Sequence, residues 1–147
     1  MFETLASQLV LVFVFVAVAF AWWKGERPER IGALFNAVVC LGVTLFQAVS
    51  HQMFETIPIL IADGILATGF LFLAFRYARL WLATVMVLEA GAFLIHASKL
   101  MELLPEGHPP AYYYYAAMNV ASMLVPLTII LGTAVVWFNR SRKLRAA

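Results

Sequence analysis

Two carboxylates lie inside long apolar stretches of this sequence, and they are its first candidates for chemistry. Asp63 lies within the apolar segment 56–75, and Glu89 lies within the segment 80–98. An ionisable group inside a membrane-spanning helix is costly, and it commonly belongs to a proton or ion pathway. Asp63 and Glu89 therefore form a candidate proton station.

The depth of these two acids predicts that they face each other. With a rise of about 1.5 Å per residue, Asp63 lies roughly 10–12 Å from the start of its helix and Glu89 roughly 13 Å from the start of its own. Two carboxylates in one desolvated site do not both ionise readily, so one would carry a proton at neutral pH. In the competing interpretation, a protonated acid donates a hydrogen bond to Gln47 or Asn119 and only holds the helices together.

The composition predicts the elements that position these groups. Of the 147 residues, 64% are hydrophobic and 12% charged, and this charged fraction is about half that of a soluble domain. The apolar residues occur in long runs, as in membrane-spanning helices. We predict an all-α, polytopic integral membrane protein that forms one transmembrane domain over 1–147, with the first helix more peripheral and a frayed basic tail at 139–147. The five predicted transmembrane helices are 5–23, 31–49, 56–75, 80–98 and 111–138.

The basic residues predict the orientation of the chain. Nine of the ten Lys and Arg residues fall on one side of a five-helix arrangement, and only Lys99 falls on the other. Because cytoplasmic segments are enriched in Lys and Arg, the N-terminus is predicted outside and the C-terminus in the cytoplasm. Eight of the nine basic residues on that side, all except Lys24, are also candidates for binding anionic lipid head groups. A role in topology alone is the competing interpretation. The nine residues are Lys24, Arg27, Arg30, Arg76, Arg79, Arg140, Arg142, Lys143 and Arg145.

A polar stripe follows the second predicted helix. Its members recur at spacings of four, four, three and four residues, which places them on one helical face. Such a stripe is expected to face protein or water and not lipid. The members are Asn36, Cys40, Thr44, Gln47 and His51.

The three histidines are weaker candidates for a cofactor site. His51, His96 and His108 are all predicted at the outer membrane level, where a metal would need three or four converging ligands or a haem two facing histidines. No metal-binding spacing motif is present. We therefore predict no metal site and no cofactor, and we keep haem or quinone binding as an alternative to a structural role at the interface.

The layout of short motifs resembles that of a group of bacterial membrane proteins. These motifs are Gly25-x-Arg27-Pro28-Glu29-Arg30, Asp63, Arg76-x-x-Arg79-x-Trp81 and His96-x-x-Lys99-Leu100. Together they resemble small uncharacterised inner-membrane proteins of alphaproteobacteria. The resemblance implies a multi-pass protein of the bacterial inner (cytoplasmic) membrane, and it implies no function.

The absence of catalytic motifs leads to the functional expectation. The sequence has no GxSxG, HExxH, P-loop or dinucleotide-binding turn, so we predict no enzyme, and no basic-aromatic pattern points to nucleic acid. The leading hypothesis is a non-enzymatic accessory or assembly subunit of a larger inner-membrane complex, with membrane lipids and that complex, or further copies of the chain, as partners. The first alternative is a small oligomeric channel or transporter that conducts protons or cations through Asp63 and Glu89. The second is a redox subunit associated with haem or quinone.

Overall fold

The protein is entirely helical over the residues that the structure describes. A computed structural model describes residues 5–49, 56–101 and 110–146, and no strand occurs among them. The prediction of an all-α fold with five helices is therefore confirmed. In chain order the helices are α1 (Leu5–Lys24), α2 (Arg27–Val49), α3 (Thr56–Tyr77), α4 (Leu80–Leu100) and α5 (Pro110–Ala146).

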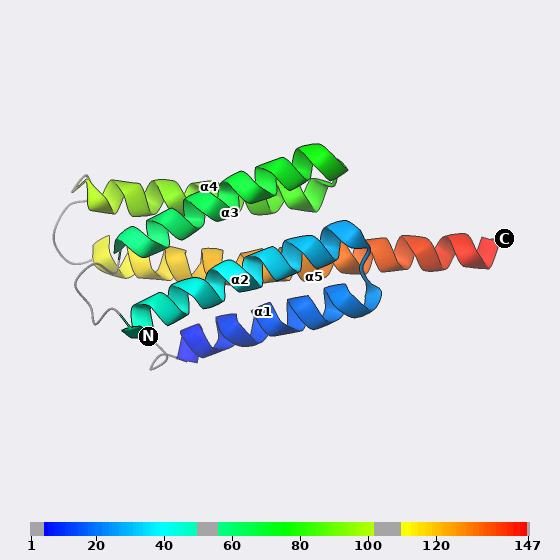
Figure 1. Cartoon of the computed structure of the whole chain (residues 1–147), viewed down its shortest axis with the longest axis horizontal. Helices are drawn as coiled ribbons and strands as arrows, with labels where there is room; N and C mark the ends of the chain where they lie inside the picture. The colour runs from blue at the N-terminus through cyan, green and yellow to red at the C-terminus, as the bar shows by residue number, and fades with distance from the viewer. Residues whose placement is uncertain (1–4, 50–55, 102–109, 147) are drawn as a thin grey trace.

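The helices form a closed ring in which consecutive helices run in opposite directions (Figure 1). Helix α3 packs on α4, α4 on α5, α5 on α1, α1 on α2 and α2 on α3, while α2 also contacts α5 across the ring. Helix α1, predicted to be more peripheral than the others, packs against α5 and α2 in this ring. Val14, Ala17 and Ala21 of α1 are buried, because small side chains allow neighbouring helices to approach closely.

Two helix boundaries differ from the predicted ones by more than two residues, for local reasons. Helix α2 begins at Arg27 instead of residue 31, since the backbone N–H of Glu26 donates to Oε2 of Glu29 at 3.0 Å and closes the first turn. Helix α5 continues to Ala146, so the predicted frayed tail is wrong over its described part. The segment 139–146 contains no Gly or Pro, and its Lys and Arg residues are good helix formers that favour a helix C-terminus.

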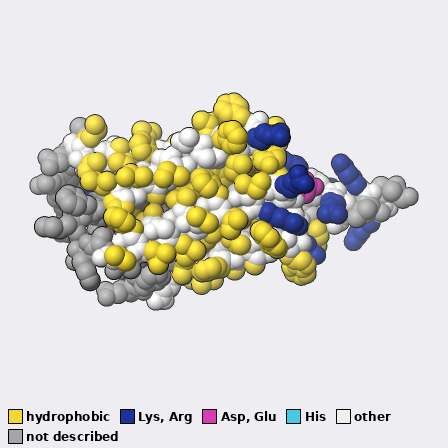
Figure 2. Space-filling view, in the orientation of Figure 1, with side chains coloured by type: hydrophobic (Ala, Val, Ile, Leu, Met, Phe, Trp, Pro, Cys, Tyr) yellow, Lys and Arg dark blue, Asp and Glu magenta, His cyan; other side chains and the backbone are white. Residues whose placement is uncertain are grey.

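The apolar helices identify a helical membrane protein. Four segments are long and apolar enough to cross a membrane: Arg27–Phe46, Ile57–Tyr77, Leu80–Leu100 and Ala116–Lys143. The described side chains of α1 give a shorter apolar segment, Gln8–Lys24. Because α1 lies beside α5 and α2 along the bundle (Figure 1), a fifth crossing stays our prediction. Apolar side chains cover most of the visible face (Figure 2).

The predicted segregation of charge is confirmed along the bundle. Lys and Arg side chains gather toward the end from which α5 projects (Figure 2). This basic end contains Lys24, Arg27 and Arg30 from the α1–α2 connection and Arg76 and Arg79 from the α3–α4 connection. We call the opposite end, which contains Lys99 and the C-terminus of α4, the Lys99 end. Which end faces the cytoplasm stays a prediction.

Candidate functional site

Asp63 of α3 and His96 of α4 form a buried polar pair in the half of the bundle nearest the Lys99 end. Asp63 Oδ2 lies 2.6 Å from His96 Nδ1, and the two side chains are 12% and 8% exposed. A distance this short is typical of a hydrogen bond that involves an ionised partner. Because a buried charge is tolerated only when it is paired and hydrogen-bonded, the two groups depend on each other.

The expectation that Asp63 faces Glu89 directly is wrong, and the helix register explains why. Counted from the α3–α4 connection at about 1.5 Å per residue, Asp63 lies roughly 21 Å away, His96 roughly 24 Å and Glu89 roughly 14 Å. In an antiparallel pair, groups at equal distance from the connection lie side by side. The sequence analysis measured the two acids from opposite ends of the bundle and so missed His96.

Glu89 is buried without a partner among the described residues. It is 6% exposed and lies on the face of α4 that also buries Val85, Ala92 and His96. The described part of the chain offers its carboxyl no hydrogen bond or ion pair. Since an unpaired carboxylate at this depth costs several kcal/mol, Glu89 is the least satisfied of the buried acids that the structure describes.

The described members of the polar stripe of α2, Asn36, Cys40 and Thr44, face the interior, as predicted. Cys40 Sγ donates to Asn36 Oδ1 at 3.9 Å, and Thr44 Oγ1 donates to the Cys40 carbonyl at 2.8 Å. Cys40 and Thr44 line a cavity that also reaches Asp63 and Asn119. Asn119 was predicted to be buried, but its side chain is exposed. The side chain of Gln47 lies outside the described part.

Of the three histidines, the structure describes only His96. His51 and His108 lie outside the described residues. His96 is buried one turn before the end of α4, where its ring reaches Asp63. Within the described residues, no three His, Cys, Asp or Glu side chains lie together in a way that would hold a metal ion. Haem or quinone binding stays an untested alternative.

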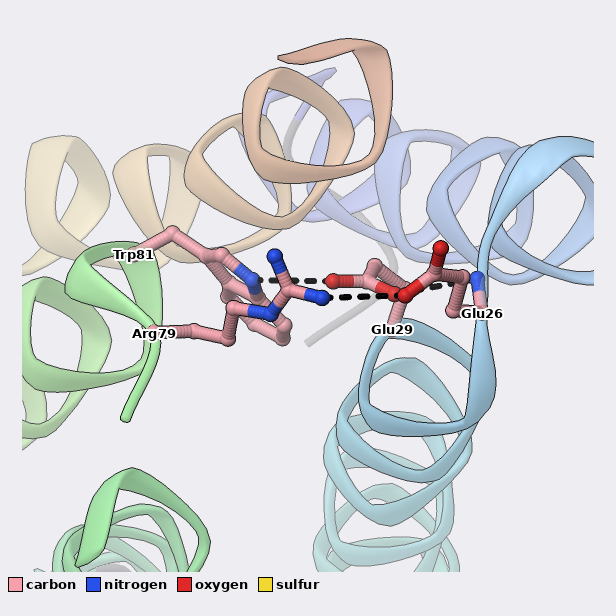
Figure 3. Close-up of polar contacts among 4 residues, drawn as sticks. All are labelled: Glu26, Glu29, Arg79 and Trp81. Carbon is pink, nitrogen blue, oxygen red and sulfur yellow. Dashed lines mark hydrogen bonds and ion pairs between the residues drawn. The ribbon is translucent and has the colours of Figure 1, made fainter. Parts of the chain in front are cut away.

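A third buried acid lies at the basic end and was missed by the sequence analysis. Glu29 is fully buried, and its two oxygens accept from different donors (Figure 3). Oε1 accepts from the indole N–H of Trp81 at 3.2 Å, and Oε2 accepts from the backbone N–H of Glu26. Glu29 entered the sequence analysis only as part of the motif Gly25-x-Arg27-Pro28-Glu29-Arg30. Its place in the first turn of a helix, three residues after Glu26, is the signal that could have identified the capping interaction.

Trp81 joins three helices at this end. A Cβ atom added at Gly132 of α5 would lie 2.5 Å from Trp81 Cγ, and one added at Gly32 of α2 would lie 2.8 Å from Trp81 Cη2. The indole therefore fits only because both neighbours lack a side chain. Beside it, Arg79 Nη2 forms an ion pair with Glu26 Oε2 at 2.9 Å on the surface (Figure 3).

Three other basic side chains, Lys24, Arg30 and Arg76, lie over aromatic rings. Lys24 Nζ lies 4.2 Å from the Trp23 ring centroid and 4.9 Å from that of Trp137. Such cation–π contacts are suited to the membrane interface. The candidates for lipid binding are exposed or partly exposed, and binding itself stays a prediction. They are Arg27, Arg30, Arg76, Arg79, Arg140, Arg142, Lys143 and Arg145.

Comparison with known proteins adds no family to this description. No protein-family model matches the chain, and neither the curated proteins nor the solved structures compared with it give a match. The resemblance to alphaproteobacterial inner-membrane proteins therefore stays a prediction. The functional argument rests on the buried polar groups themselves.

Proposed function

We propose that this chain is a small proton-conducting or proton-coupled membrane protein of the bacterial inner membrane, with its C-terminus in the cytoplasm. The observation that carries the proposal is the Asp63–His96 pair, at 2.6 Å and almost fully buried between α3 and α4. A carboxylate and an imidazole in contact can exchange one proton across a single hydrogen bond. Asp, Glu and His inside membrane helices recur in the proton relays of pumps and transporters.

Glu89 supplies a second station on the same helix face. It lies two helical turns from His96, or about 10 Å by the helix rise. That separation is too long for direct transfer, so a proton passing between the two groups needs an intervening water molecule. Glu89 supports a relay because its carboxyl has no hydrogen bond within the described residues that would hold its proton in place.

The location is supported by the distribution of charge. The basic end collects the cations of two connections and of the α5 extension, as expected for the cytoplasmic side of a bacterial inner-membrane protein. In this orientation, the Asp63–His96 pair lies in the outer half of the membrane.

Proton flux in liposomes tests the proposal. The purified chain is reconstituted with a trapped pH-sensitive dye, and a potassium diffusion potential is imposed. We expect proton entry above that of protein-free liposomes, and a fall of roughly 10²-fold in Asp63→Asn, the size of effect typical of a lost proton-transfer group.

Glu26→Gln is the matched control, because it makes the same kind of change in an acid that is exposed at the basic end. It should conduct like the unmodified chain. Flux through the unmodified chain that equals the protein-free background would contradict conduction. Loss of flux in both variants would show that the effect is not specific to Asp63.

An accessory subunit of a larger complex is the second candidate, and Asn119 favours it. This amide is exposed on a helix whose neighbouring surface is apolar, with Val120 and Leu124 also exposed. An amide in that setting is best satisfied by a partner helix. A tagged chain purified gently from native membranes would then bring a larger protein with it at constant ratio, and Asn119→Leu would weaken that association. Isolation of a defined homo-oligomer alone would count against this candidate.

A further inference from the structure

A cavity in the Lys99 half of the bundle reaches the candidate proton site. Its volume is about 220 Å³, and α1, α2, α3 and α5 all contribute to its wall. Asp63 and Leu66 are buried members of the wall, whereas Asn119 and Ser122 are exposed. The cavity is therefore lined by exposed residues on α5 and by the buried Asp63 on α3.

The polar groups of this cavity suit water. Asp63 engages His96 through Oδ2, and no bond to Oδ1 is recorded within the described residues. The amide of Asn119 and the hydroxyl of Thr44 lie on the same wall. Proline at position 126 has no N–H, so the Ser122 carbonyl lacks its usual helical donor.

The size of the cavity also suits water. A buried water needs two to four polar partners and roughly 10–15 Å³ of space on the same measure. The cavity, at about 220 Å³, exceeds that several times over.

The bundle is closed between this cavity and the basic end. Phe70, Leu82, Val85 and Ile129 are completely buried and belong to one apolar cluster. Beyond them, the Trp81 indole fills the space between α2 and α5 and is held by Glu29.

We propose that the cavity is a water-filled access route that connects Asp63 with the Lys99 end of the bundle and not with the basic end. Its occupants are water and the protons that water carries. The use of this route for proton transfer rests on the proposed function, whereas its hydration and one-sided access do not. A lipid chain or a partner side chain filling the same space is the outcome that would refute it.

Cysteine accessibility in native membranes tests this proposal. Cys40 is the only cysteine, so Cys40→Ser provides a background without thiols. Thr44→Cys and Ser122→Cys then place a thiol on the cavity wall, and Thr68→Cys places one at an exposed position of α3 that does not line the cavity. Lys99→Cys and Arg145→Cys report the two membrane sides. The probe is a membrane-impermeant trimethylammonium methanethiosulfonate, applied to right-side-out and to inverted vesicles.

We expect Thr44→Cys and Ser122→Cys to react only from the side on which Lys99→Cys reacts. Their rates should exceed that of Thr68→Cys by roughly tenfold or more, because the reactive thiolate forms where water reaches the sulfur. Reaction from both sides would overturn one-sided access. Unreactive cavity thiols beside a reactive Lys99→Cys would show a dry or filled cavity and would also overturn the proposal.

Two cavity positions are tested so that the result does not depend on one variant that fails to fold. Each variant is retained only if its size-exclusion elution in detergent matches that of the unmodified chain. The liposome assay separates this proposal from the proposed function. One-sided labelling without proton flux would leave the water route intact and refute proton conduction. Proton flux with unreactive cavity thiols would support proton conduction and refute the water route.

Discussion

The two halves of the bundle bury carboxyl groups in opposite ways. At the basic end, both oxygens of Glu29 accept hydrogen bonds, and glycines on two helices enclose the Trp81 indole that supplies one of them. Toward the Lys99 end, Asp63 has one short contact to His96 and borders a cavity, while Glu89 has no hydrogen bond within the described residues.

This difference separates a structural acid from candidate functional ones. A carboxylate whose acceptor sites are filled by fixed donors keeps one state, because any change of protonation breaks a bond. A carboxyl with an unfilled acceptor beside a cavity can change its proton without such a loss. Burial alone therefore does not identify function in this protein, and the state of the hydrogen bonds does.

The largest effect is expected from removing the indole at the basic end. Trp81→Ala should lower the free energy of unfolding by about 3–5 kcal/mol, because it leaves a large cavity and removes a donor from Glu29. Thermal unfolding in mild detergent, followed by circular dichroism, measures this. Trp81→Phe retains most of the volume and should cost only the part due to the lost hydrogen bond, so equal losses in the two variants would contradict the role of that bond.

The close approach of Gly132 to the same indole predicts a smaller loss. Gly132→Ala places a methyl group 2.5 Å from Trp81 Cγ, and such overpacking typically costs about 1–3 kcal/mol. Gly91→Ala on α4 is the matched control, since nothing lies within 4 Å of its added Cβ. It should be neutral or stabilising by about 0.5–1 kcal/mol, because alanine favours a helix. The pair is compared by detergent melting, and a control as unstable as Gly132→Ala would refute the packing argument.

The two glutamates should respond in opposite directions to the same substitution. Glu29→Gln replaces one acceptor with an NH₂ group that faces an N–H donor, which should destabilise the protein by about 1–3 kcal/mol. Glu89→Gln removes an ionisable group that has no donor within the described residues, so stability should stay equal or rise. Denaturation of both variants under identical conditions decides this. A greater loss in Glu89→Gln would mean that Glu89 has a partner essential to the fold.

The smallest effect is expected at the surface ion pair. Arg79→Ala removes the ion pair with Glu26. The side chains of Arg79 and Glu26 are 41% and 44% exposed. Exposed pairs contribute only about 0–1 kcal/mol, and salt screens them. Melting at low and high salt should therefore differ little from that of the unmodified chain, and a loss as large as that of Trp81→Ala would assign this pair to the buried network.

Local sequence patterns predicted the helices and the charge asymmetry because both depend on neighbouring residues. Apolar runs required helices, and the basic residues of separate connections meet at one end once the helices alternate in direction. The polar stripe Asn36, Cys40 and Thr44 was found for the same reason, since helical periodicity fixes a face. The Asp63–His96 pair is long-range, and it could be anticipated only by counting residues from the α3–α4 connection.

The sequence by itself determined an apolar, all-helical chain with its cations at one end, because hydrophobicity, helix periodicity and charge are properties of short segments. Only the tertiary structure decided which acids are satisfied. Glu29 accepts a hydrogen bond from Trp81, Asp63 contacts His96, and Glu89 has no hydrogen bond within the described residues. These differences depend on the rotation and register of separate helices. Those are set by side-chain packing across the ring, where Gly32 and Gly132 leave room for one indole.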